Sequence, residues 1–159
     1  MSAWNYKQYA LAPLPPLDIT CEKPIRFNVI LKAEDGKIVL RYEQPDAPDR
    51  NYIAITQDTV VEVALLGDQV YFSNELDAIT TKEALSSFYG GLEYDGYDEK
   101  LDRYKIVRFR ARYNQGGRYG TRHRFNINVD LLQLSECGEP HWITLSIDPD
   151  IKNPPPKAN

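Results

Sequence analysis

Hydrophobic and polar residues alternate along much of the chain between residues 25 and 148. In residues 25–32, for example, Ile25, Phe27, Val29 and Leu31 lie on one side, while Arg26, Asn28 and Lys32 point away. A two-residue period is typical of β-strands with one buried face. The period predicts strands in eight segments: 25–32, 37–43, 51–56, 59–66, 69–73, 104–113, 123–133 and 141–148.

The predicted strands are short and are separated by turn signals such as Asp35-Gly36 and Gly67-Asp68. Strands with one polar face favour antiparallel pairing, because strands buried on both faces would be apolar throughout. We therefore expect one all-β domain over residues 1–159, an antiparallel β-sandwich of about eight strands.

One segment predicts a helix instead. Thr80 and Glu83 have the spacing of a capping box, and Leu85 and Phe88 then continue an apolar stripe. Glycines at 90–91 are typical of a helix end. The pattern predicts one short helix at about residues 81–89.

Proline marks both ends of the chain. Residues 1–16 include three prolines, whose fixed φ and missing N–H favour an extended lead-in. Residues 149–159 include four, and we expect them to form a flexible tail. No basic segment followed by an apolar run suggests a signal peptide. No apolar run reaches the length of about 18 residues that a transmembrane helix needs.

The chain has two cysteines, Cys21 and Cys137, too few for a disulfide framework. We expect two reduced, largely buried thiols in a cytoplasmic protein; the alternative is a single bridge between them.

Residues suited to catalysis are few. His123 and His141 are the two histidines, and both lie in phase with the apolar side of their predicted strands, so we expect them to be buried or half-buried. The sequence has neither a G-x-x-x-x-G-K-[ST] loop nor a G-x-G-x-x-G turn. We expect no cofactor, and we favour a protein that is not an enzyme.

Acidic residues gather in the stretch from Glu93 to Asp102. Their spacing does not fit a twelve-residue EF-hand loop. We expect these carboxylates to be solvated or to pair with nearby arginines, rather than to bind a metal. The alternative is a calcium loop formed by Asp95, Asp98, Glu99 and Asp102.

The chain has a net charge of −4, but residues 100–124 contain nine basic residues and one acidic residue. With a two-residue period, Arg108, Arg110 and Arg112 share the polar side of one strand, and Arg122 and Arg124 share that of the next. If the two strands form a hairpin, these five arginines lie on one surface, where like charges repel unless an anion compensates them.

Three kinds of anion could do so. The first is internal, from carboxylates such as Glu62, Asp130, Asp148 or the 95–102 loop. The second is an acidic protein or another copy of this chain. The third is a phosphorylated ligand or nucleic acid, with Tyr104, Tyr113 and Tyr119 as stacking surfaces. The acidic remainder of the chain argues against a general nucleic-acid binder.

Several stretches, among them PLPPLDI, DAITTKEAL, YGGLEYDGYDEKLDRYK, FNINVDLL and IDPDIKNPPP, resemble a group of small bacterial proteins that carry the label "nucleotide synthetase". The resemblance covers most of the chain and implies a bacterial, cytoplasmic protein. It identifies no catalytic residues.

The sequence thus favours a non-catalytic binding or assembly module. Its surface would be the arginines 108, 110, 112, 122 and 124, facing an acidic partner or another subunit of a homo-oligomer. The alternative is a small enzyme or ligand-binding protein that acts on a phosphorylated small molecule through the same arginines. We expect no membrane association.

Overall fold

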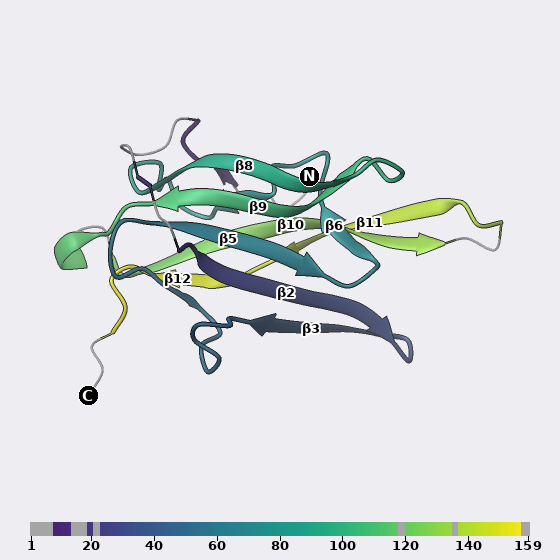
Figure 1. The fold of residues 1–159 in the computed structure, drawn as a ribbon, viewed down its shortest axis with the longest axis horizontal. Coiled ribbons are helices and arrows are strands. Elements are labelled where there is room, and N and C mark those ends of the chain that lie inside the picture. Colours follow the sequence, from purple (N-terminus) through teal and green to yellow (C-terminus); the bar gives the residue numbers. More distant parts are fainter. Residues whose placement is uncertain (1–7, 14–18, 21–22, 118–119, 135–136, 157–159) are drawn as a thin grey trace, which may run out of the picture.

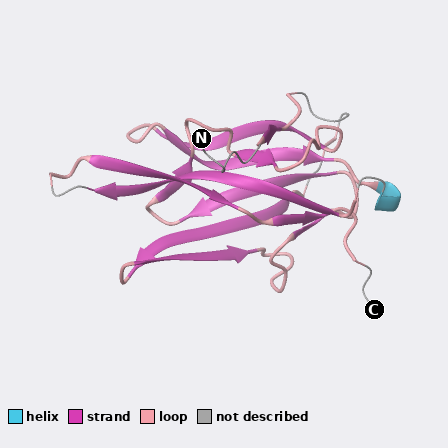
Figure 2. Cartoon of the chain, turned by 180° about the vertical axis from the view of Figure 1, so that it is seen from behind, coloured by secondary structure: helices cyan, strands magenta, loops and turns pink. Residues whose placement is uncertain are grey.

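Two β-sheets pack face to face in the structure, a computed structural model that describes residues 8–13, 19–20, 23–117, 120–134 and 137–156 (Figure 1). The chain is drawn almost entirely as strands and loops (Figure 2). The all-β sandwich is therefore confirmed. Among the described residues the helical element is the 3₁₀ turn Gln115–Gly117, and no helix there is long and apolar enough to cross a membrane.

The five-stranded sheet lies in front in Figure 1 and has the order β3-β2-β5-β9-β8. Its strands are β2 (Ile25–Glu34), β3 (Lys37–Glu43), β5 (Thr59–Leu66), β8 (Tyr89–Asp98) and β9 (Arg103–Ala111).

The seven-stranded sheet is built around β10 (Arg122–Leu134), which pairs with four other strands. Those partners are β6 (Val70–Phe72), β7 (Ile79–Thr81), β11 (Pro140–Ile147) and β12 (Asp150–Lys152). The short strands β1 (Tyr9–Ala10) and β4 (Ile53–Ala54) complete the sheet by pairing with β7 and β12.

The core fills the space between the sheets with the apolar side of each strand. In β5, Val61 and Val63 are fully buried, whereas Glu62 between them is half-buried. Burial of each such aliphatic side chain stabilises the fold by about 1.5–3 kcal/mol. The predicted alternation also gives the buried sides of β2, β9 and β10: Phe27, Val29, Leu31, Val107, Phe109, Ala111, Phe125, Ile127, Val129 and Leu131.

The sheets are mixed rather than antiparallel, which corrects the expected pairing. β2 and β5 run parallel, as do β4 and β12. After the β2–β3 hairpin, the chain crosses to the other sheet to form β4 and then returns beside β2 as β5. A connection that leaves the sheet in this way brings the next strand back in the same direction.

The predicted helix at residues 81–89 is wrong. Residues 79–81 are strand β7, and β8 begins at Tyr89, so too few residues remain between them to repay the nucleation cost of a helix. A single turn is left, in which the N–H groups of Phe88 and Tyr89 donate to the carbonyl of Leu85 at 3.0 and 3.2 Å. Leu85 and Phe88 are nevertheless buried, as the apolar stripe indicated.

The predicted hairpin of residues 104–113 and 123–133 is also wrong. β9 is paired on both sides, with β5 and with β8, so β10 cannot pair with it and lies in the other sheet. β8 was not expected as a strand, because its sequence YGGLEYDGYD contains three glycines and little apolar alternation.

Part of the expected flexible tail belongs to the sheet. Asp150–Lys152 forms β12 between β10 and β4, where Ile151 lies opposite both His123 and Ile53. Ile151 and Asn153 are buried. Within the predicted lead-in, Tyr9–Ala10 forms β1.

Asn153 joins three segments at one end of the sandwich through a buried hydrogen-bond network. Its side-chain amide donates to the hydroxyl of Tyr89 at 3.0 Å and to the carbonyl of Arg112 at 2.9 Å. Its Oδ1 accepts the N–H of Asn114 at 2.7 Å. The Tyr89 hydroxyl lies 2.6 Å from Nδ1 of His123, and burial raises the pKa of that hydroxyl. The network fixes the last described segment of the chain onto both sheets.

We predict that Asn153→Ala lowers the free energy of unfolding by about 2–3 kcal/mol, because it leaves buried N–H and C=O groups without partners. Urea denaturation measures the change. Asn51→Ala, at an exposed loop position, is the matched control and should stay within about 0.5 kcal/mol of the wild type. Equal stabilities of the two variants would contradict a structural role for Asn153.

Candidate functional site

The five arginines of the predicted binding surface lie on two different sheets. Arg108 and Arg110 belong to β9 in the five-stranded sheet, and Arg112 follows the end of that strand. Arg122 and Arg124 belong to β10 in the seven-stranded sheet. The structure therefore separates them into two groups.

Arg108 lies between carboxylates on both neighbouring strands. Its Nε donates to Oε1 of Glu62 on β5 at 2.9 Å, and its Nη1 donates to Oδ2 of Asp95 on β8 at 3.1 Å. The hydrogen bond to Asp95 raises the pKa of Arg108. The N–H of Gly96 and the Arg108 guanidinium together lower the pKa of Asp95.

Arg110 and Arg122 also have internal partners. Arg110 donates from Nη1 to Oε1 of Glu93 at 3.1 Å and from Nε to the carbonyl of Ile19 at 3.1 Å. Arg122 donates from Nε to Oδ2 of Asp150 at 2.9 Å. Internal carboxylates thus lie opposite these two arginines as well, which is the first of the three alternatives that the sequence left open.

Arg112 and Arg124 have no carboxylate within ion-pair distance in the part of the chain that the structure describes. Arg124 is exposed, whereas Arg112 is half-buried and its carbonyl accepts the amide of Asn153. That any of the five arginines binds an anion or a partner stays a prediction, but they do not form one common surface.

The acidic stretch is used within the β8–β9 hairpin. Oδ1 of Asp98 accepts the N–H groups of Lys100 and Leu101 at 3.0 and 3.2 Å. Oδ1 of Asp102 accepts the hydroxyl of Tyr97 at 2.6 Å. Among the described residues, no group of three or more His, Cys, Asp or Glu side chains could hold a metal ion. The calcium loop, which would also need Glu99, has no converging set of ligands there.

His123 is buried, as its position in the pattern indicated, but His141 is exposed. His141 lies near the start of β11, where the β10–β11 hairpin extends beyond the rest of the sandwich (Figure 1). Cys137, in the same hairpin, is exposed, so the expectation of a buried thiol is wrong there. Cys21 and Tyr119 lie outside the described residues.

A cavity of about 270 Å³ lies where the β8–β9 hairpin meets the segment between β6 and β7. Tyr94 spans the two, because its hydroxyl accepts the N–H of Ala78 at 2.9 Å. Burial raises the pKa of Tyr94. The cavity is lined by Phe72, Ser73, Asn74, Glu75, Leu76, Asp77, Tyr94, Asp102, Arg103 and Tyr104.

Arg103 is the one buried cation of this lining. Its Nε donates to Oδ2 of Asp130 at 2.8 Å, and its Nη1 donates to the carbonyl of Leu101 at 2.9 Å. The guanidinium lies 4.0 Å from the ring centre of Trp142, at a distance suited to a cation–π contact. Oδ1 of Asp130 accepts the hydroxyl of Thr144 at 3.0 Å. The Arg103 and Asp130 side chains are 10% and 2% exposed, so the pair is almost wholly removed from water.

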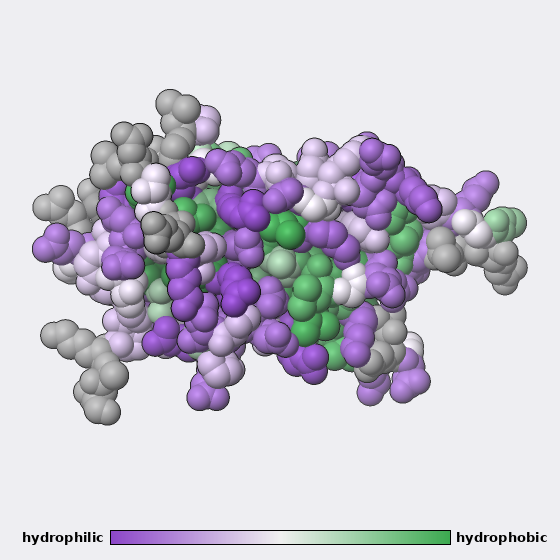
Figure 3. All heavy atoms as spheres, viewed as in Figure 1, coloured by the Kyte–Doolittle hydropathy of each residue, from purple (hydrophilic) through white to green (hydrophobic). Residues whose placement is uncertain are grey.

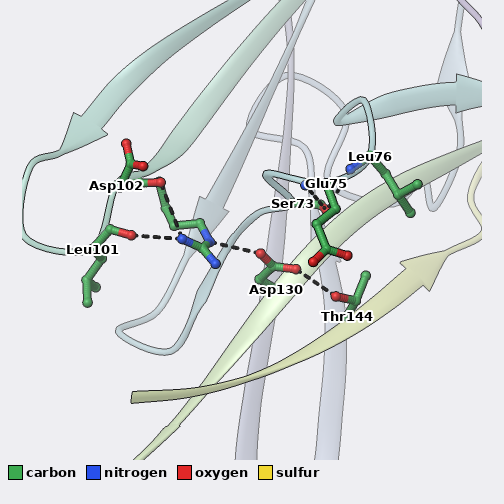
Figure 4. Close-up of polar contacts among 8 residues, drawn as sticks. Ser73, Glu75, Leu76, Leu101, Asp102, Asp130 and Thr144 are labelled. Atoms are coloured by element: carbon green, nitrogen blue, oxygen red, sulfur yellow. Dashed lines mark hydrogen bonds and ion pairs between the residues drawn. The ribbon is translucent and has the colours of Figure 1, made fainter. Parts of the chain in front are cut away.

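Local turns hold both walls of the cavity in place. Ser73 Oγ accepts the N–H groups of Glu75 and Leu76 at 3.2 and 3.1 Å, which closes a turn after β6. On the other wall, Asp102 adopts a left-handed φ of 52°, a conformation that aspartate tolerates better than most residues. Figure 4 shows these two loops facing each other across Asp130.

Sequence reasoning found only part of this site. Tyr104 is a stacking surface in one of the three alternatives for the arginines, and Asp130 is among the carboxylates of another. Arg103 was not singled out, although it lies in phase with the buried Val107 and Phe109. An arginine on the buried side of a strand needs a carboxylate partner. The position of Arg103 in the two-residue period was therefore a sequence signal for a buried ion pair. Nothing in the 73–77 sequence indicates that it borders a cavity.

A scan against protein families matches residues 1–156 to a family described as "Predicted novel nucleotide synthetase". The chain belongs to this family, which confirms the resemblance drawn from the sequence. A search of curated proteins found no match.

The buried ion pair yields a stability prediction. Asp130→Ala should lower the free energy of unfolding by about 3–5 kcal/mol, because it leaves the Arg103 guanidinium buried without its carboxylate. Replacing the pair by Arg103→Met with Asp130→Leu should recover most of this loss, since no buried charge then remains. Urea denaturation compares them. A double variant as unstable as Asp130→Ala would show that the uncompensated charge is not the cause.

Proposed function

We propose that this member of the family binds a nucleoside-type small molecule in the cavity lined by Arg103, Tyr94 and Tyr104. The observation that carries the proposal is a fixed guanidinium with unused donors at a cavity with aromatic walls. Hydrogen bonds among the described residues use Nε and Nη1 of Arg103, so the N–H groups of Nη2 are left for a ligand.

The aromatic side chains favour a planar ligand. The Tyr94 and Tyr104 ring centres are 5.2 Å apart with the rings tilted by 56°, and Tyr97 lies 5.0 Å beyond Tyr104. Tyr94 and Tyr104 each keep more than a third of their surface exposed. Exposed tyrosine faces are suitable platforms for a nucleobase.

Three carboxylates at the cavity favour hydroxyl and amino groups over phosphate. Glu75, Asp77 and Asp102 are all exposed and line the same space as Arg103. Carboxylates accept hydrogen bonds from a ribose or an exocyclic amine, whereas they repel a phosphate dianion. A volume of about 270 Å³ lies just below the usual range of small-molecule sites, about 300–1,000 Å³, and so favours a small ligand.

The family description supports the same ligand class, because a nucleotide contains a nucleoside. The proposal assigns binding and no chemical step. Ser73, the one hydroxyl-bearing aliphatic side chain of this lining, serves as an acceptor within its own turn. We place the protein in the cytoplasm, where the exposed thiol of Cys137 stays reduced.

The proposal is tested by thermal unfolding with adenosine, guanosine, cytidine and uridine, and with their 5′-monophosphates. A ligand that binds only the folded state raises the unfolding temperature, and we expect this for at least one nucleoside, with a smaller effect of its monophosphate. Tyr104→Ala should weaken binding of that nucleoside about tenfold or more, as loss of one stacking contact does.

Tyr52→Ala is the control, because Tyr52 is a half-buried tyrosine that does not line the cavity. It should leave affinity unchanged in calorimetric titration. If no nucleoside stabilises the protein, or if Tyr104→Ala and Tyr52→Ala bind equally well, the proposed site is wrong.

The alternative of a phosphorylated ligand is supported by a second groove. Its volume is about 230 Å³, and three basic side chains, Lys23, Arg26 and Arg50, line it with one acidic side chain, Asp46. If monophosphates stabilise the protein more than nucleosides do, and Arg50→Ala rather than Tyr104→Ala removes the effect, the ligand binds in this groove.

A further inference from the structure

β3 forms one edge of the five-stranded sheet and exposes apolar side chains. Ile38, Val39 and Leu40 are 52%, 38% and 44% exposed. In Figure 1, β3 is the outermost strand of its sheet, next to β2. The space-filling view shows hydrophobic surface over this part of the molecule, interrupted by polar residues (Figure 3). Exposed apolar edges are pairing sites for other strands.

Several other edges of the sandwich carry features that hinder pairing. β1 and β4 have two residues each, β11 has a proline at its first residue, and β8 has a bulge between Gly90 and Glu93. Short strands, prolines and bulges are features that prevent pairing at an edge. β3 has seven residues and contains neither a proline nor a bulge.

The turn before β3 determines which backbone groups face outward. Asp35 and Gly36 have φ values of 49° and 75°, as a two-residue type I′ turn requires. The pair that closes such a turn, at positions 34 and 37, exchanges hydrogen bonds with each other, and the pattern then alternates. It follows that the N–H and C=O groups of Ile38, Leu40 and Tyr42 point away from β2.

β3 is complementary to itself in the antiparallel direction. With Leu40 opposite Leu40 of a second copy, Ile38 lies opposite Tyr42, so all three residues with outward backbone groups pair with one another. In the same register, Lys37 lies opposite Glu43 at both ends. Opposite charges directly across a ladder stabilise the pairing.

We propose that two copies of the chain associate through antiparallel pairing of their β3 strands about Leu40. The pairing joins the two five-stranded sheets into one and has the self-complementary form of a two-fold symmetric interface. It brings Leu40 against its counterpart and covers apolar surface that is exposed in the single chain. The side chains of Lys37 and Glu43 then provide the charge pairs that fix the register.

The end of β3 favours this register, because pairing about Leu40 uses the whole available edge. Gln44 turns inward, where its Nε2 donates to the carbonyls of Arg50 and Tyr52 at 3.0 and 2.7 Å. Pro45 follows and has no N–H to donate. The available edge therefore runs from Lys37 to Glu43, and Leu40 is its middle residue.

Charge exchange at the two ends tests the proposal. Light scattering of the wild type should give twice the chain mass of 18.3 kDa. Lys37→Glu and Glu43→Lys should each give the single-chain mass, because each puts like charges opposite each other twice. An equimolar mixture of the two variants should recover the doubled mass. The Lys37→Glu strand then has glutamate at both ends, and each glutamate lies opposite a lysine of the Glu43→Lys strand. Recovery in the mixture also shows that neither variant fails to fold.

Leu40→Pro should also give the single-chain mass, because it removes an outward N–H that β2 does not use. The matched control is Arg110→Ala with Arg124→Ala, which changes the predicted arginine surface and should keep the doubled mass. A wild type of single-chain mass at all concentrations, an unchanged mass in both charge variants, or a mixture that stays at the single-chain mass would each overturn the proposal. Loss of the doubled mass in the arginine variant alone would move the interface to that surface.

Discussion

The structure depends on the hydrogen bonds that the backbone of one thirteen-residue strand, β10, makes along both of its edges. Buried N–H and C=O groups must be paired, and from Val129 to Leu131 this strand pairs with β6 and β11 at once. Further toward its start it pairs with β7 and β12. Because these partners come from widely separated parts of the sequence, β10 connects the middle of the chain with its last described strand.

Charge in this fold is arranged in two different ways. On the outer side of the five-stranded sheet, arginines alternate with carboxylates from neighbouring strands, as Arg108 does between Glu62 and Asp95. Such exposed pairs contribute little to stability, but they neutralise a concentrated positive charge. The pair of Arg103 and Asp130 is different, because burial makes each partner necessary to the other and holds the guanidinium in one position. A ligand site needs a guanidinium that is held in one position and still has free N–H donors. A mobile arginine on the surface is not held in this way.

The sequence predicts the strands in which apolar and polar residues alternate regularly. It does not predict the elements whose structure is decided by the strands that lie beside them in the fold. β2 and β5 follow the two-residue period closely, since each buries one side and the period records it. β10 was found by the same period, but Asn126, Asn128 and Asp130 on its other side are buried as well. β8 was missed because the backbone pairing with β9, rather than apolar side chains, makes it a strand.

The residues near 81–89 have a helical spacing, but strand pairing on both sides of them prevails. Arg108, Arg110, Arg122 and Arg124 lie on the strands predicted for them. Their predicted arrangement relative to each other was wrong, because strand order is a long-range property. The same limit applies to the cavity, whose walls come from two separate segments, residues 72–77 and 94–104.

The position of β12 has a consequence for how the chain folds during synthesis. This strand lies between β10 and β4, and residues 150–152 form the last strand in the described part of the chain. The β2–β3 hairpin is local and can form as soon as residue 43 has left the ribosome. β4, by contrast, has to wait for a partner made about a hundred residues later. Until then its buried isoleucine and the facing edge of β10 are uncovered, so the nascent chain passes through an interval in which it is exposed to wrong strand pairing.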